Sequence, residues 1–157
     1  MDKMNSVYRH RVIPAVLFFT LSLLLINPSG IMAGPDINIT VKTISASRKG
    51  NSVDPGLKDL VQELQSVFRY SSYEFLGQKD LKLSSNKNGV VPLPEQRVMN
   101  ISVKGIEGDR VVLEIEILKN NNRIFQTVIK LSNKKSLTIG GPEYKGGNLL
   151  FNIFAAF

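Results

Sequence analysis

From residue 37 onward, apolar and polar side chains alternate along much of the chain. Ile37, Ile39 and Val41 are separated by polar residues, which is the two-residue period of a strand with one buried face. This period predicts a strand over residues 37–47. In the C-terminal half it predicts strands over residues 98–104, 111–117, 125–131, 136–139 and 149–157, with turns at 107–109, 120–122, 133–135 and 140–147.

A helical period interrupts this pattern between residues 55 and 68. Asp54 can accept hydrogen bonds from the first free amides of a helix, and the fixed φ of Pro55 suits the first helical position. The apolar side chains that follow recur at steps of three and four and form one stripe. The stripe consists of Leu57, Leu60, Val61, Leu64 and Phe68. We therefore expect a helix from Pro55 to Phe68 that packs this stripe on a sheet.

The segment between this helix and the C-terminal strands is less regular. Its β-forming residues predict a strand over residues 70–76 that stops at Gly77, and a second strand near residues 80–84. Residues 86–94 (NKNGVVPLP) contain two prolines and a glycine, a composition that predicts a surface loop. Together these elements predict an α+β, β-rich domain, in which one N-terminal helix packs on a mainly antiparallel meander sheet that is sandwich-like or partly rolled.

The first 33 residues have the order of a cleavable signal peptide. Basic residues precede an apolar run over residues 15–26, which is followed by the turn-forming residues 27–30 and by Ala33, a small residue suited to the cleavage site. The apolar run is shorter than the roughly twenty residues that a membrane-spanning helix needs. We therefore expect residues 34–157 to form a single exported domain without a permanent transmembrane helix.

Charge and cysteine content narrow the expected location. The chain has 20 Lys and Arg, 13 Asp and Glu, and no cysteine. Removal of the leader lowers the formal net charge from +7 to about +5, which suits anionic neighbours such as lipid head groups or cell-wall polymers. A small exported domain without disulfides is typical of bacteria. We expect the protein in the periplasm or at the cell surface of a bacterium.

The mature domain lacks the side chains on which most catalytic chemistry depends. The one histidine, His10, lies in the leader and the chain has no cysteine, which excludes histidine-activated nucleophiles, thiol chemistry and zinc sites of thiolate or imidazole. Glu114 and Glu116 alternate on the predicted solvent face of a strand. The glycine-rich run at residues 140–147 lacks the Lys-Ser/Thr ending of a phosphate-binding loop. We expect no enzymatic activity, no cofactor and no metal.

Basic residues beside aromatic residues mark a candidate interaction surface. Phe68, Tyr70, Tyr73 and Phe75, with Arg69 among them, suit either a stacking platform or packing within the core. Two predicted turns add exposed lysines. The candidate surface consists of Arg69, Tyr70, Tyr73, Lys134, Lys135, Tyr144 and Lys145. Because export separates the protein from nucleic acid, we expect its partner to be an envelope protein or an anionic envelope polymer.

A short segment resembles part of a known family. Residues 127–133 (TVIKLSN), followed by residues 137–141 (LTIGG), are similar to the strand, turn, strand and Gly-Gly segment of bacterial secretin channel domains. The resemblance covers residues 127–141 and does not extend to the rest of the chain. It implies an association with envelope assemblies and assigns no functional residues.

These observations favour a non-enzymatic exported protein, a binding or accessory subunit of an envelope complex that acts through its sheet edges and basic face. Two alternatives stay open. The apolar alternation that leads to Phe157 resembles the terminal strand of a small outer-membrane β-barrel, although the helix leaves little chain for eight long strands. A carboxylate-based hydrolase of cell-wall glycans would need only two facing acids.

We predict that the leader is removed after Ala33, because the basic, apolar and small-residue order ends there. N-terminal sequencing of the protein from the envelope fraction should begin at Gly34. Recovery of a chain that still begins at Met1 would contradict this prediction.

Overall fold

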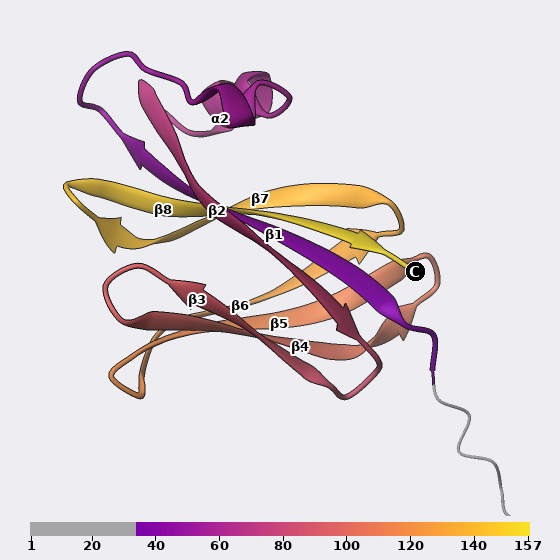
Figure 1. Ribbon diagram of the computed structural model, residues 1–157. Coiled ribbons are helices and arrows are strands. Elements are labelled where there is room, and N and C mark those ends of the chain that lie inside the picture. Colours follow the sequence, from indigo (N-terminus) through magenta and orange to yellow (C-terminus); the bar gives the residue numbers. More distant parts are fainter. Residues whose placement is uncertain (1–33) are drawn as a thin grey trace, which may run out of the picture. The chain divides into compact units, whose positions relative to one another are not determined.

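Eight strands form two four-stranded antiparallel sheets that pack face to face (Figure 1). The computed structural model describes residues 34–157, and the signal peptide predicted for residues 1–33 lies outside the described residues. The first sheet has the strand order β2-β1-β8-β7, and the second has the order β3-β4-β5-β6. The strands are β1 (Ile37–Ser47), β2 (Ser72–Leu83), β3 (Asn88–Leu93), β4 (Arg97–Glu107), β5 (Arg110–Lys119), β6 (Asn122–Ser132), β7 (Lys135–Tyr144) and β8 (Gly147–Ala156).

The main core lies between the two sheets. The alternating apolar residues of β1, such as Ile39 and Val41, share it with those of β8, such as Ile153, and with those of β4 and β5, such as Ile101 and Leu113. All of these side chains are at most 1% exposed. The two-residue period of the sequence therefore corresponds to one face of each sheet, as predicted.

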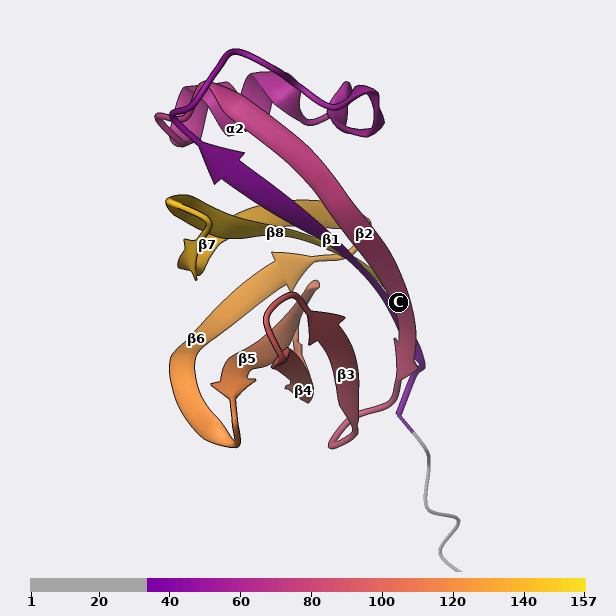
Figure 2. The same ribbon diagram turned by 60° about the vertical axis from the view of Figure 1, so that its left-hand side comes forward.

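A second, smaller core covers part of the outer face of the first sheet. A 3₁₀ helix, η2 (Pro55–Leu57), and an α-helix, α2 (Val61–Val67), lie above that sheet in Figures 1 and 2. Leu57 and Leu64 pack there against Tyr73 of β2, and the fully buried residues of this cluster are Ile44, Ala46, Leu57, Leu64, Tyr73 and Leu150. The first sheet therefore has one face in each core.

The helical region differs from the continuous N-terminal helix that the sequence predicted. It lies between β1 and β2, and its α-helical part is confined to residues 61–67. Asp54 caps as expected, since its side chain accepts a hydrogen bond from the amide of Gly56 at 2.8 Å, but it caps the 3₁₀ turn. A turn over residues 58–60 separates this 3₁₀ turn from α2. The predicted stripe still faces the sheet, with Leu60 and Phe68 partly buried beside Leu64.

β2 and β3 overturn two predictions. β2 continues through Gly77, where the sequence predicted a stop, because a β-bulge between residues 75 and 77 absorbs the irregularity opposite Thr43 and Ile44. Residues 88–93 form β3, where a loop was predicted. β3 is an edge strand, and a proline such as Pro92 is tolerated there because the missing amide removes no bond within the sheet.

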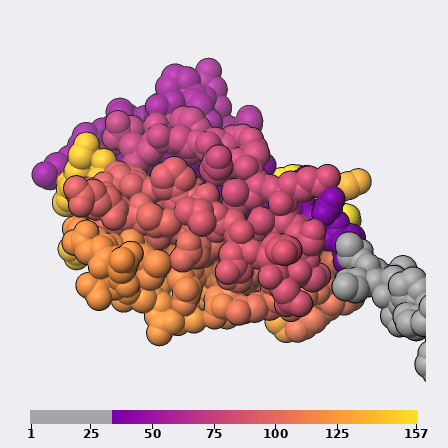
Figure 3. Space-filling model, turned by 60° about the horizontal axis from the view of Figure 1, so that its bottom comes forward, coloured from indigo at the N-terminus to yellow at the C-terminus, as the bar shows by residue number. Residues whose placement is uncertain are grey.

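The hairpin turns mostly follow the prediction. Asn120 and Asn121 have φ of 51° and 63°, values that asparagine tolerates in two-residue hairpin turns. The turn predicted at residues 140–147 is shorter than expected, because β7 continues to Tyr144 and only Lys145 and Gly146 turn the chain. β4, β5 and β6 form an antiparallel meander in the second sheet and β7 and β8 form a hairpin in the first, so the turn after β6 carries the chain from one sheet to the other. The structure confirms a β-rich α+β fold (Figure 3 views it from the side of the second sheet).

Replacement of Leu64 tests the second core. Leu64→Ala should lower the free energy of unfolding by about 2 to 5 kcal/mol, because it empties a fully buried leucine site. Gln65→Ala on the exposed side of the same helix is the matched control and should change stability little. Equal melting curves for the two variants would mean that the helix contributes little to the fold.

Candidate binding groove and the predicted interaction surface

A groove of about 430 Å³ lies between β2 and β3, which are edge strands of different sheets. The two strands meet at the turn over residues 84–87 and separate from there, as Figure 2 shows. The residues that line the groove are Thr43, Leu76, Gly77, Gln78, Lys79, Val91, Pro92, Pro94 and Tyr144. β1 and β7 each contribute a buried residue, Thr43 (6% exposed) and Tyr144 (7% exposed).

The groove is closed toward the turn that joins β2 and β3. There the side chains of Leu81 and Leu83 pack against Gly89, so closely that a Cβ atom at Gly89 would lie 2.7 Å from Leu81 Cδ1. A side chain at position 89 would therefore displace the Leu81 side chain. A chain that lies along the groove would have to bend out toward solvent to continue past this contact.

The edge of β2 is partly covered by the chain itself. The amide of Tyr73 donates to the carbonyl of Ser52 at 2.8 Å, and its carbonyl accepts from the amide of Asp54 at 2.9 Å, so residues 52–54 pair with β2 in the parallel sense. The main-chain groups of Tyr73 therefore point away from β1. Because this direction alternates along an antiparallel strand, the groups of Gln78 also point away from β1 once the bulge at residues 75–77 has been passed.

The two walls of the groove offer different main-chain groups. On the β2 wall, Gln78 presents both an amide and a carbonyl. On the β3 wall, Pro92 has no amide hydrogen, and prolines of this kind discourage pairing at a sheet edge. An added strand would therefore form its main-chain hydrogen bonds with β2 and its side-chain contacts with β3.

Arg97 joins the two sheets beside the groove. It begins β4, is 8% exposed, and donates from Nη1 to the carbonyl of Glu143 on β7 at 2.9 Å. Its Nη2 atom lies 2.8 Å from Glu95 Oε2, and its Nε atom is buried without a hydrogen-bond partner. Because Glu143 immediately precedes Tyr144, this contact holds the end of β7 against the second sheet.

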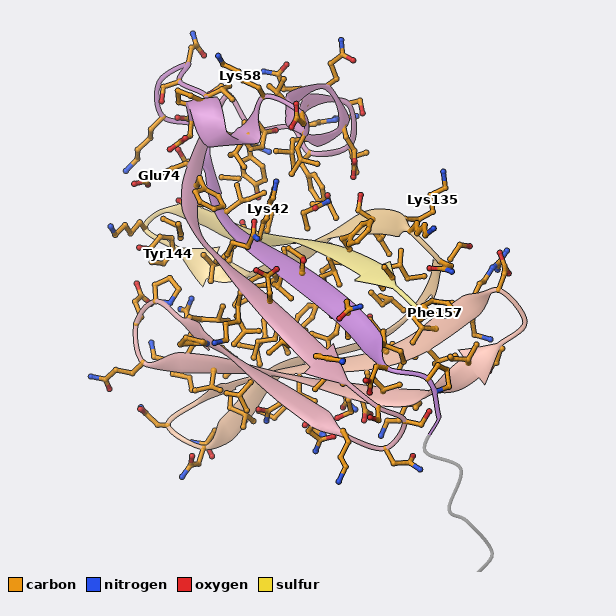
Figure 4. The ribbon with its side chains drawn as sticks, turned by 45° about the vertical axis from the view of Figure 1, so that its right-hand side comes forward. Lys42, Lys58, Glu74, Lys135, Tyr144 and Phe157 are labelled. Atoms are coloured by element: carbon orange, nitrogen blue, oxygen red, sulfur yellow. The ribbon has the colours of Figure 1, made fainter. Side chains whose placement is uncertain are left out.

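The predicted interaction surface divides between the two ends of the first sheet. Arg69 and Lys145 are exposed at the end where β1 finishes, and there the hydroxyl of Tyr70 donates to Asn148 Oδ1 at 2.7 Å. Lys134 and Lys135 lie at the opposite end, beside Phe157, as the register of β7 with β8 requires. Figure 4 shows the separation of Lys135 from Tyr144.

Two of the predicted surface residues are buried. Tyr73 is 1% exposed, and its hydroxyl donates to the carbonyls of Leu64 and Phe68 at 3.1 and 2.8 Å. Burial is the main cause that raises the pKa of Tyr73. Tyr144 lines the groove, and a hydrogen bond with its side chain raises the pKa of Lys145. Tyr73 therefore fixes the helix, while Tyr144 lies at the groove and Lys145 lies over the ring of Tyr144.

Several basic residues at the groove and at the end of the first sheet were not predicted from the sequence. Arg48 and Lys49 follow β1 and lie close to the Lys145 end of the sheet, since Arg48 Nε donates to the carbonyl of Arg69 at 3.3 Å. Lys79 lines the groove. The sequence contained only a weak indication that Lys79 lies at a binding site. Lys79 falls between the two strands that were predicted for this segment, and β3, which forms the opposite wall of the groove, was predicted to be a loop.

Acidic residues on the surface accept hydrogen bonds from neighbouring side chains. Hydrogen bonds from Lys104 and Gln126 lower the pKa of Glu114, and hydrogen bonds from Thr40 and Gln78 lower the pKa of Asp80. A catalytic acid needs the opposite shift. None of the residues that line the groove is acidic, and within residues 34–157 no three His, Cys, Asp or Glu side chains converge as a metal site would require.

Comparison of the chain with protein-family models, with curated proteins and with solved structures finds no match. Over residues 34–157, no helix is both long and apolar enough to cross a membrane.

Arg97 supplies a test of the contact beside the groove. Arg97→Gln should lower the free energy of unfolding by about 1 to 3 kcal/mol, because the carbonyl of Glu143 and the carboxylate of Glu95 lose a buried charged donor. Arg123→Gln is the matched control, since Arg123 is bound to Glu116 on the surface, and it should cost less than about 1 kcal/mol. Chemical denaturation of both variants measures the difference, and an equal loss would contradict the assigned role.

Proposed function

We propose that this chain is a non-enzymatic binding protein of the bacterial envelope, which is exported and holds an extended segment of an envelope protein in the groove between β2 and β3. The observation that carries the proposal is a groove of about 430 Å³ bordered by two edge strands that belong to different sheets. An edge strand can pair with an incoming strand through main-chain hydrogen bonds, while pockets for alternate side chains give selectivity.

The composition of the groove supports a polypeptide occupant. Leu76, Val91, Pro92 and Pro94 provide apolar contacts for side chains, while Gln78 on β2 provides main-chain groups. The chain already uses this mode of pairing, because its own residues 52–54 occupy the edge of β2 at Tyr73. A guest strand would continue along the same edge where residues 52–54 leave it.

The chemistry of the groove also supports a non-enzymatic role. Catalysis by carboxylates would require two acids across a cleft, and the lining contains one ammonium group and no carboxylate. Export to the envelope is supported by the signal-peptide pattern of residues 1–33, and the basic composition suits an anionic environment.

Site-specific photo-crosslinking tests the proposal. A photoreactive amino acid at Gln78, in the full chain produced in its native host, should crosslink an envelope protein through one defined segment, which mass spectrometry of the conjugate identifies. The same amino acid at Lys135, which is exposed at the far end of the first sheet, is the matched control. Identical crosslinks from both positions, or none from Gln78, would overturn the proposal.

A further inference from the structure

We propose that the groove takes the C-terminal end of its partner chain and that Lys79 binds the terminal carboxylate. This inference rests on the proposed function and names the part of the partner that is recognised. Three features of the groove support it, namely its closed end, its charge and the direction in which the edge of β2 pairs.

The closed end favours a chain terminus. Leu81 and Leu83 fill the space beside Gly89, so a guest that enters from the side of Pro94 ends before these residues. An internal segment of a long chain would have to bend out of the groove before this contact and lose its pairing with β2. A chain terminus can end inside the groove and does not have to leave it.

The charge of the groove selects which terminus enters. Lys79 is the charged residue among those that line the groove, and within residues 34–157 its ammonium group takes part in no ion pair. Of the β2 residues in the lining, it is the one nearest to Leu81. An ammonium group at this place attracts a carboxylate and repels the amino group of an N-terminus.

In the described part of the chain, residues 34–157, no acid forms a direct ion pair with Lys79, although its charge contributes to the lowered pKa of Asp80. Asp80 follows it in sequence, but its carboxylate lies on the opposite side of β2, where it accepts hydrogen bonds from Thr40 at 2.6 Å and from Gln78. Some other lysines are paired, as Lys82 is with Asp36 at 2.9 Å and Lys130 is with Glu107 at 2.6 Å, so what distinguishes Lys79 is its place in the lining of the groove. Lys79 thus offers its charge to a ligand.

The direction of pairing agrees with a C-terminus. Residues 52–54 run parallel to β2, as the bridge between Val53 and Tyr73 shows. A guest that continues in the same direction runs from Gly77 toward Leu81, with its C-terminus at the closed end. The terminal carboxylate then reaches the part of the groove where Lys79 lies.

Three synthetic peptides test the inference on the full chain, purified after export. The first is acetyl-Thr-Val-Thr-Val-Thr with a free carboxylate, the second is its C-terminal amide, and the third has a free amino terminus and a C-terminal amide. Backbone amide resonances of groove residues report binding. We expect the carboxylate peptide to bind about tenfold or more tightly than either amide, the range for one hydrogen bond to a charged group.

Variants of Lys79 separate charge from packing. Lys79→Gln should reduce the ratio of the affinity for the carboxylate peptide to the affinity for its amide to about one. Lys79→Arg should restore part of this ratio, because the positive charge returns. Lys135→Gln, at the far end of the sheet, should keep the full preference. The preference should also weaken as salt concentration rises.

The outcomes distinguish the two proposals. Equal binding of the three peptides in the groove would overturn carboxylate recognition and leave the binding groove in place. Tighter binding of the peptide with the free amino terminus would also overturn it. If no peptide shifts the groove resonances and the Gln78 crosslink is also absent, the proposed function itself fails.

Discussion

The structure depends on the burial of both faces of the first sheet around β8. In the middle of this strand five consecutive residues, 149–153, are buried. Leu149, Phe151 and Ile153 point to the main core, while Leu150 points to the core under the helix. One layer cannot cover both faces of a strand, so the second sheet and the helical segment are both required. Loss of either layer would expose apolar surface of the same strand.

The arrangement in two sheets leaves edge strands, and these edges are blocked or covered to different extents. A sheet edge carries unpaired main-chain groups that recruit other strands. At β3 the proline Pro92 reduces this tendency, and at the start of β2 the chain's own residues 52–54 occupy the edge. The remainder of β2, near Gln78, has neither form of protection. The groove lies at this unprotected part, where a bulge also bends the strand, and bulges are common beside functional sites.

The candidate site was predictable only in part. The basic and aromatic composition indicated an interaction surface, and of its residues Tyr144 lines the groove, with Lys145 over its ring. Tyr73 is a core residue, because a tyrosine at a buried strand position can satisfy its hydroxyl with the carbonyls at a helix end. Lys134 and Lys135 are close to Tyr144 in sequence, but β7 places them a strand length away. An extended strand rises about 3.3 Å per residue, so residues at its two ends lie at opposite ends of the sheet.

The sequence by itself determined the strands with strict alternation, their hairpin turns and the side chains of the main core, because a two-residue period fixes which face of a strand is buried. It also determined the helix stripe and the absence of histidine and cysteine after residue 33. The tertiary structure decided that residues 88–93 pair as an edge strand, that β2 continues through Gly77, and that the two strands separate to form a groove. Pairing between distant segments compensates for local signals such as proline and glycine, and a local pattern contains no information on which edge remains open.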